Sequence, residues 1–321
     1  MELGTRPGRR RRAAGIAVKL AACLLAAALA TPAASAGAAG DTAAGDTATS
    51  GTEDPASYVA LGDSFTAGPG IPDQIPESGG CARSDHNYPH LVAAALSVDR
   101  FTDVSCGGAT TEHMAQAQPL PGGLTNGPQF DALSADVDLV SVGIGGNDIG
   151  FAEIILTCAA HSLLLPITAP CRNYYTRHGD ELGARIDATA PKVATVLAAI
   201  RDRAPGARIL VVGYPVILPD RGPGCWPLVP IAIGDVAWLR TVQGRLNTML
   251  ADEAARAGAH FVDTYSSSVG HDVCRLPGRK WVEGFIPTAP AAPVHPNALG
   301  MANTAEQVLE TIAALRTRSV R

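Results

Sequence analysis

Short apolar runs alternate with longer segments of helical periodicity from about residue 58 to the end of the chain. Five of these runs have the length and the β-branched or aromatic content that strands favour. They are residues 58–61, 101–105, 138–145, 208–215 and 260–265. The third run, DLVSVGIG, is apolar enough for a central strand buried on both faces, and the fifth is short enough for a sheet edge.

Three segments between and after these runs predict long helices. Residues 181–204 are expected to form one helix with a kink at Pro191. Residues 236–257 carry one apolar face at helical spacing, made of Leu239, Val242, Leu246, Met249 and Leu250. The last helix is predicted to begin after Asn297, a favourable N-cap. Its inward stripe consists of Met301, Ala305, Val308, Leu309 and Ile312.

This alternation of strands and helices predicts an α/β fold with a parallel five-stranded sheet covered on both faces. Ligands of such sheets gather at the carboxyl ends of the strands. Short polar motifs follow three of the predicted strands here, namely GDSFTAG (62–68), CGGATT (106–111) and GGNDIGF (145–151). A fourth motif, VHPNALG (294–300), precedes the last helix. Together they supply a hydroxyl, close-approach glycines, a carboxamide and an imidazole, which an acyl-transfer enzyme requires.

The N-terminus carries the layout of an export signal. A basic stretch, RPGRRRRAAG, precedes an apolar run at 20–30 that is too short to span a bilayer, and small residues follow at 34–36. We expect residues 1–36 to be a signal peptide cleaved near Ala36. A lipoprotein box at LAAC (20–23) and a twin-arginine route are the alternatives. Residues 37–57 are small, polar and repetitive, which predicts a flexible spacer before the body at 58–321.

Charge and composition limit the partners of the exported protein. Residues 1–36 hold six of the 25 basic and one of the 30 acidic side chains, so the rest carries a formal net charge of −10. Nucleic acid and anionic membrane surfaces should repel such a chain. Hydrophobic residues make up 46% of the sequence, which is enough for a sizeable core. We expect a monomer with no stable membrane insertion in its mature form.

Six cysteines remain once Cys23 is removed with the signal. An even number in an exported chain predicts disulfides, and six cysteines allow 15 pairings. We favour pairing between sequence neighbours, which closes short loops: Cys81 with Cys106, Cys158 with Cys171, and Cys225 with Cys274. No C-x-x-C pair is present, and Pro89 separates His86 from His90, so neither a metal site nor any cofactor is predicted.

The polar motifs, in this order, resemble the blocks of the SGNH (GDSL-type) hydrolase family, particularly its secreted actinomycete lipases and esterases. GDSFTAG is similar to the first block, with Phe65 in place of the usual leucine. CGGAT resembles the second block, GGND the third and HPN the fifth. The resemblance covers about residues 58–316. It implies a flavodoxin-like, three-layer α/β/α sandwich with strand order 2-1-3-4-5, and a cofactor-free esterase.

The resemblance also implies a role for each matching residue. Ser64 is expected to be the nucleophile, and its backbone N–H to be one oxyanion donor. Gly108 supplies a second backbone N–H, with Gly107 as the neighbouring candidate, and the Asn147 amide is the third donor. His295 is expected to act as the general base.

One position departs from the family pattern. The family commonly has aspartate three residues before its histidine, and here Ala292 stands there. We hypothesise that the backbone carbonyl of Ala292 accepts the second N–H of His295 and fixes its tautomer, which leaves a Ser–His dyad. A carboxylate from elsewhere, such as Glu283 or Asp272, is the alternative.

The sequence therefore predicts a secreted carboxylic ester hydrolase, with fatty-acyl or lipid esters favoured through the resemblance. A carbohydrate O-acetyl esterase on the same fold and a non-catalytic secreted binding protein are the alternatives. No G-x-S-x-G motif is present, which disfavours the α/β-hydrolase architecture. GIGGND lacks the spacing of a dinucleotide-binding loop.

Overall fold

A computed structural model describes residues 54–319 of the chain. Its strands are β1 (Ser57–Gly62), β2 (Arg100–Asp103), β3 (Gln118–Pro119), β4 (Thr125–Asn126), β5 (Leu139–Gly143), β6 (Arg208–Val212) and β7 (His260–Val262). Its α-helices are α1 (Ser64–Ala67), α2 (Tyr88–Leu96), α3 (Phe151–Ser162), α4 (Pro170–Thr176), α5 (Glu181–Arg203), α6 (Ile233–Arg256), α7 (Thr264–Ser267) and α8 (Ala298–Ser319). Short 3-10 helices lie at Pro76–Ser78, Thr111–Met114, Pro121–Gly123 and Gln129–Ala132.

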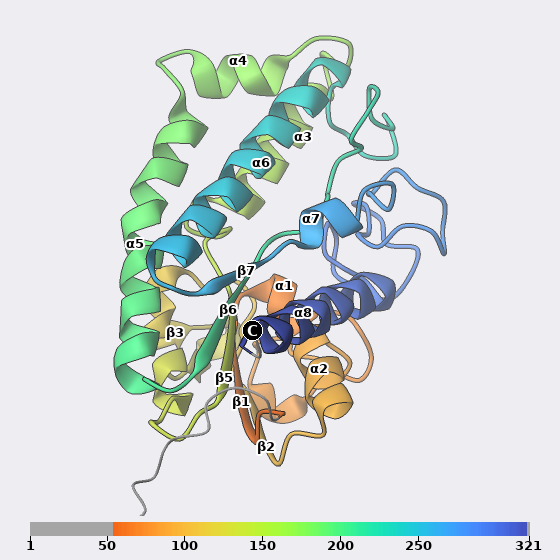
Figure 1. Cartoon of the computed structure of the whole chain (residues 1–321). Helices are drawn as coiled ribbons and strands as arrows, with labels where there is room; N and C mark the ends of the chain where they lie inside the picture. The colour runs from red at the N-terminus through yellow and green to blue at the C-terminus, as the bar shows by residue number, and fades with distance from the viewer. Residues whose placement is uncertain (1–53, 320–321) are drawn as a thin grey trace, which may run out of the picture. The chain divides into compact units, whose positions relative to one another are not determined.

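The central sheet is parallel and has the order β2-β1-β5-β6-β7 (Figure 1). Each of its strands falls on one of the five predicted apolar runs. Numbered within the sheet, the order is 2-1-3-4-5, as the family resemblance implies. The short run at 260–265 forms an edge strand, as predicted, because β7 pairs only with β6 within the described residues. The parallel arrangement brings the motifs after β1, β2 and β5 to the same edge of the sheet.

Helices cover both faces of this sheet, so the three-layer α/β/α sandwich is confirmed. Alternate residues of β1 face opposite sides, as strand geometry requires. Val59 and Leu61 pack into a core cluster with buried residues of α3, α5 and α6. Tyr58 and Ala60 pack into a second cluster with α2 and α8. Figure 1 shows α5 and α6 on one side of the strands and α2 and α8 on the other.

The three predicted long helices are present. The helix α5 continues through Pro191, and α6 begins at Ile233, three residues before its predicted start. The helix α8 follows Asn297, whose Oδ1 accepts hydrogen bonds from the N–H groups of Leu299 and Gly300 at 3.0 and 3.2 Å. This side-chain cap satisfies backbone donors that the first turn leaves unpaired, which confirms the predicted helix start.

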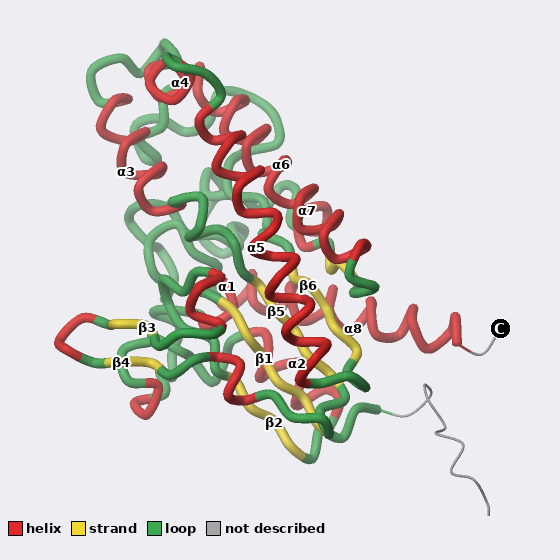
Figure 2. Tube along the Cα trace, turned by 90° about the vertical axis from the view of Figure 1, so that its left-hand side faces the viewer, coloured by secondary structure: helices red, strands yellow, loops and turns green. Residues whose placement is uncertain are grey.

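Some elements were not predicted from the sequence. The strands β3 and β4 form a two-stranded antiparallel pair, which Figure 2 shows to one side of the main sheet. Each has two residues, too few for a periodic pattern. The helix α3 was not predicted, because apolar residues lie on both its sides: Ile154 and Cys158 are buried, but Leu156 is exposed, so no clean amphipathic stripe marks it.

The structure joins the cysteines as neighbours along the chain, in the predicted pairing. Cys81 bonds to Cys106, Cys158 to Cys171, and Cys225 to Cys274. The predicted signal peptide and all but the last residues of the predicted spacer lie outside the described residues. Among the helices of residues 54–319, none is long and apolar enough to cross a membrane.

Candidate active site

The site begins where β1 ends. Gly62 has φ +154°, and a Cβ there would lie 2.3 Å from the Thr66 hydroxyl and 2.7 Å from the Gly143 carbonyl. Glycine is therefore required for the chain to leave the sheet and start α1 at once. Ser64 opens that helix, and its N–H makes no hydrogen bond within the described residues. The result is a serine with an unpaired backbone donor at the carboxyl end of a buried strand.

The Asp63 side chain stabilises this turn through two hydrogen bonds. Its Oδ1 accepts the Phe65 N–H at 2.8 Å, and the Tyr214 hydroxyl donates to its Oδ2 at 2.6 Å. The same hydroxyl accepts the Gly146 N–H at 2.8 Å. Burial raises the pKa of Asp63 to about 7, against the opposing effect of the hydrogen bonds from Tyr214 and Phe65. Tyr214 thus connects the turn that carries Ser64 to the loop after β5, a connection that the sequence did not predict.

His295 meets Ser64 although 231 positions separate them. Its Nε2 lies 2.8 Å from the Ser64 Oγ. Burial lowers the pKa of His295, and the hydrogen bond to the Pro293 carbonyl acts in the opposite direction. A lowered pKa keeps the imidazole neutral near pH 7, and the neutral ring can take a proton from a hydroxyl.

The carbonyl that orients His295 is that of Pro293, so the prediction of Ala292 was wrong. The Pro293 carbonyl accepts the Nδ1–H at 2.8 Å. The Ala292 carbonyl instead accepts the backbone N–H of His295 at 3.2 Å. The turn passes through Val294 at φ +59°, and this tight bend places the carbonyl two residues back, rather than three, beside the ring.

The alternative carboxylates both bond elsewhere. Glu283 is buried and accepts hydrogen bonds from Thr288 and from the Asn297 side chain. Asp272 accepts from the Cys274 N–H and pairs with Arg275. The Glu283 backbone N–H donates to the His295 carbonyl at 2.9 Å, but its carboxylate makes no hydrogen bond to the His295 ring. Within the described residues, His295 therefore has no carboxylate partner.

The loop after β2 contacts both Gly62, just before the Ser64 turn, and Asn147. The Cys106 N–H donates to the Gly62 carbonyl at 3.0 Å, and the Asn147 Nδ2 donates to the Ala109 carbonyl at 2.9 Å. The Gly107 N–H is taken by the Cys81 carbonyl at 2.8 Å. The Gly108 N–H makes no hydrogen bond within residues 54–319. Of the two candidate glycines, Gly108 is therefore the one with a donor to offer.

A pocket opens beside Ser64 between α3 and α6. Apart from Asp63, Ser64, Gly146, Asn147, Tyr214 and Gln243, its lining is hydrophobic: Phe65, Ile149, Phe151, Ile154, Ile155, Ile217, Leu218, Leu239, Val242 and Leu246. Phe65, the departure from the family's usual leucine, forms an aromatic wall. Its ring centroid lies 5.0 Å from that of His295, 5.1 Å from that of Tyr214 and 5.6 Å from that of Phe151.

One group of metal-ligand types occurs among the described residues. Asp73, Asp85 and His86 each bring one ligand atom within 4.8 Å of the others, and all three residues are exposed. The His86 ring bonds to Asp85, whereas the His90 ring bonds to Asn87, so the two histidines do not converge. Within the described residues, the group makes no hydrogen bond to Ser64 or His295.

Comparison with known proteins gives the family. Residues 60–302 match the model of the GDSL-like lipase/acylhydrolase family. The chain is 40% identical over 259 residues to Lipase 2 of Streptomyces coelicolor, covering 79% of this chain and 85% of that protein. The chain belongs to the GDSL-like lipase/acylhydrolase family. As a member of this family, it is a carboxylic ester hydrolase.

Two solved structures of related Streptomyces enzymes have a fold similar to that of this chain. Phospholipase A1 of Streptomyces albidoflavus matches with a TM-score of 0.65 and 28% identity, over 80% of this chain and 99% of that one. An extracellular lipase of Streptomyces rimosus matches with a TM-score of 0.63 and 27% identity, over 79% and 99% of the two chains. These similarities agree with the SGNH hydrolase fold that the sequence motifs imply.

Proposed function

We propose that this chain is an exported serine esterase that hydrolyses fatty-acyl or other lipid esters through an acyl-enzyme on Ser64. The observation that carries the proposal is the 2.8 Å contact between the Ser64 Oγ and the His295 Nε2, beside an apolar pocket. No cofactor is needed, because a nucleophile, a base and oxyanion donors suffice for ester hydrolysis.

The first half-reaction forms the acyl-enzyme. The Ser64 Oγ attacks the ester carbonyl carbon while its proton passes to the His295 Nε2. The carbonyl oxygen becomes negative and is held by the N–H groups of Ser64 and Gly108 and by the second amide hydrogen of Asn147. The bond from carbon to the alcohol oxygen then breaks, and His295 returns the proton to the departing alkoxide.

The second half-reaction releases the acid. Water attacks the acyl carbon and gives its proton to His295, so the same oxyanion donors bind a second tetrahedral intermediate. The bond to the Ser64 Oγ breaks, and His295 protonates the serine oxygen. Throughout, the Pro293 carbonyl holds the Nδ1 proton, so that the Nε2 always faces Ser64.

The pocket between α3 and α6 supports an acyl chain longer than acetyl. Its walls near Ser64 are aliphatic and aromatic side chains of both helices. Each methylene that moves from water into such a pocket contributes about 0.8 kcal/mol. An acetyl group would leave most of these walls without a ligand.

Export is part of the proposal. The layout of residues 1–36 supports it, and the family resemblance is to secreted enzymes. N-terminal sequencing of the protein from a culture supernatant tests this, with a mature N-terminus near Gly37 as the expected result. Retention in the cells with residues 1–36 intact would contradict it.

A chain-length series of p-nitrophenyl esters, from acetyl to palmitoyl, tests the reaction and the substrate class together. We expect kcat/KM to rise beyond butyryl, and Ser64→Ala and His295→Ala to abolish turnover. Matched controls are Ser266→Ala and His178→Ala, because both residues are exposed and neither contacts the site. These controls should behave as wild type.

Two outcomes of this series would favour the other functions. Activity confined to acetyl and butyryl esters would favour a carbohydrate O-acetyl esterase. Absent turnover with all esters, and absent labelling of Ser64 by an alkylphosphonate, would favour a binding protein. Leu239→Phe, which narrows the pocket, should reduce octanoyl hydrolysis about 10-fold more than acetyl hydrolysis.

A further inference from the structure

We propose that Gln118 is a positioning residue that orients the Gly107–Gly108 peptide, so that the Gly108 N–H faces the oxyanion. This inference rests on the proposed acyl-enzyme function and names a residue outside the sequence motifs. Gln118 opens β3, the short strand beside the main sheet. Its side-chain Nε2 donates a hydrogen bond to the Gly107 carbonyl at 2.8 Å.

The geometry of a peptide links that carbonyl to the catalytic donor. The Gly107 carbonyl and the Gly108 N–H belong to one planar unit, and in a trans peptide they point in opposite directions. Fixing the carbonyl toward Gln118 therefore fixes the N–H on the opposite side. Gly108 has φ +75°, and glycine on both sides of the peptide offers little resistance to rotation of this unit. The Ala109 N–H closes a turn around this peptide by donating to the Cys106 carbonyl at 3.1 Å, and a hydrogen bond to the Gly107 carbonyl selects one orientation of the peptide inside that turn.

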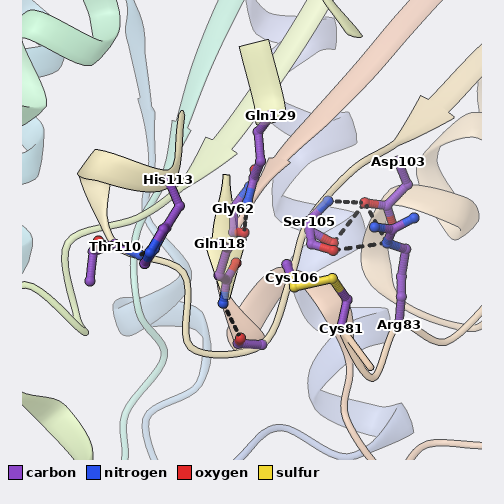
Figure 3. The surroundings of a disulfide bond; sticks show 11 residues. Gly62, Cys81, Arg83, Asp103, Ser105, Cys106, Thr110, His113, Gln118 and Gln129 are labelled. Atoms are coloured by element: carbon purple, nitrogen blue, oxygen red, sulfur yellow. Dashed lines mark hydrogen bonds and ion pairs between the residues drawn. A yellow bond between two sulfur atoms is a disulfide. The ribbon is translucent and has the colours of Figure 1, made fainter. Parts of the chain in front are cut away.

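Other contacts hold the loop on either side of this peptide, but only Gln118 binds the Gly107 carbonyl among the described residues. The Cys81 carbonyl holds the Gly107 N–H, and the disulfide to Cys81 holds Cys106. Figure 3 shows Gln118 on one side of this stretch and the disulfide on the other. Within the described residues, Gln118 is the only hydrogen-bond donor to the Gly107 carbonyl.

The environment of Gln118 indicates a role other than packing. The residue is 4% exposed, and its Oε1 is buried with no hydrogen-bond partner in the described part of the chain. Leaving a buried polar atom unpaired costs about 1–3 kcal/mol. An apolar side chain of the same length would fill this space without that cost. A buried amide that uses its donor and leaves its acceptor unpaired fits a residue whose donor serves the active site.

The first test is Gln118→Met, which keeps the length of the side chain and removes the donor. We expect kcat for p-nitrophenyl butyrate to fall about 10- to 100-fold with KM unchanged, less than the about 10²–10³-fold cost of deleting an oxyanion donor. Affinity for an alkylboronic acid, which binds as a tetrahedral adduct of Ser64, should fall in proportion. Thermal stability should change little, because losing the hydrogen bond to the Gly107 carbonyl is offset by removing the unpaired Oε1.

Gln74→Met is the matched control. The Gln74 amide also donates to backbone carbonyls, those of Gly68 and Ile71, but these lie outside the oxyanion loop. We expect its kcat to be within about twofold of wild type. Equal losses of kcat in both variants would show a general structural effect and overturn the proposal, as would an unchanged kcat in folded Gln118→Met.

Gln118→Glu gives a signature that a structural role cannot give. A buried carboxyl has a raised pKa, and its protonated form can donate to the Gly107 carbonyl whereas its ionised form cannot. The ratio of its kcat to that of wild type should therefore increase about tenfold as pH falls through that raised pKa. A ratio that does not change with pH contradicts the proposal. Wild-type protein without esterase activity would overturn the proposed function itself, which separates the two failures.

Discussion

Ser64 and His295, the proposed catalytic pair, are held in different ways. Ser64 lies at the end of β1, above a buried network in which Asp63, Tyr214 and Gly146 connect segments far apart in the chain. A separate hydrogen bond joins the Gln118 side chain to the Gly107 carbonyl in the loop after β2. His295 lies on a turn held by nearby main chain, with the Pro293 and Ala292 carbonyls taking its two N–H groups. The position of Ser64 depends on particular side chains, whereas the position of the His295 ring depends on the path of the backbone.

This difference determines which substitutions the site tolerates. A backbone carbonyl is present whatever side chain its residue carries, so the histidine turn can lose the family's aspartate and still fix a tautomer. The hydroxyl of Tyr214 and the amide of Gln118 have no such substitute. Mutations should therefore be costly on the serine side and mild in the turn that precedes the histidine.

The largest effect among the surrounding residues is expected at Asn147. Asn147→Ala removes one proposed oxyanion donor and the tie to the Ala109 carbonyl, so kcat should fall about 10²–10³-fold. KM should change little, because the lost interaction strengthens only as charge develops. Steady-state kinetics with p-nitrophenyl butyrate measures this. A change confined to KM would assign Asn147 to substrate binding instead.

A smaller loss of kcat is expected for Tyr214→Phe. The ring stays, but the Gly146 N–H and the Asp63 Oδ2 lose their partner. The free energy of unfolding should drop by about 1–3 kcal/mol, and kcat by about 10-fold because the Asn147 loop shifts. Urea unfolding and steady-state kinetics check the two effects. Full activity in a destabilised protein would mean that the network holds the fold but not the site.

The same network predicts an unusual pH dependence of stability at Asp63. Burial raises its folded-state pKa to about 7, above the unfolded value of 3.8, so its contribution to stability is lost as pH rises between these values. Asp63→Asn keeps a good N-cap and removes this titration. The Tm of Asp63→Asn minus that of wild type should therefore increase from pH 4 to pH 7. A difference that is constant over this range would contradict the assignment.

The pH dependence of activity concerns the histidine side. The proposed mechanism needs neutral His295, and burial lowers the pKa of His295 below its ordinary 6.5. Plotted against pH, kcat/KM should rise through an apparent pKa lower than 6.5 and then level off. An inflection clearly above 6.5 would indicate a charged partner that stabilises the imidazolium.

The smallest effects are expected in the turn itself. Both Ala292→Ser and Pro293→Ala keep the two backbone carbonyls that bind His295. We therefore expect kcat/KM to stay within about threefold of wild type, a change in activation free energy of less than about 1.4 kcal/mol. Parallel assays with Asn147→Ala give the large loss of kcat/KM against which these small changes are compared. A loss of 100-fold in folded Ala292→Ser would show that the comparison between side-chain and backbone support is wrong.

The sequence predicted those parts of the site that lie next to strand ends. The five apolar runs gave the sheet, and its parallel order brings the serine and asparagine motifs to one edge. Tyr214 also follows a strand, β6, but its partner Asp63 is 151 positions away, and no local pattern records that pairing. Gln118 lies in a two-residue strand without periodicity.

The orienting carbonyl was missed for a different reason. Which carbonyl reaches the His295 ring depends on the dihedral angles of the turn, and Val294 adopts φ +59°, a conformation uncommon for a β-branched residue. The family's aspartate stands three residues before its histidine, which indicated the carbonyl of residue 292. The bend at Val294 instead brings the carbonyl of residue 293 to the ring. Residue identities alone do not carry that information.

The central claim is that Ser64 is a nucleophile activated by His295 alone. It is tested most directly by the rate at which an alkyl p-nitrophenyl phosphonate modifies the intact protein, followed by mass spectrometry. We predict one adduct per chain, on Ser64, with a rate about 10²–10⁴-fold lower in His295→Ala. Modification of another residue, or an equal rate in His295→Ala, would contradict the account.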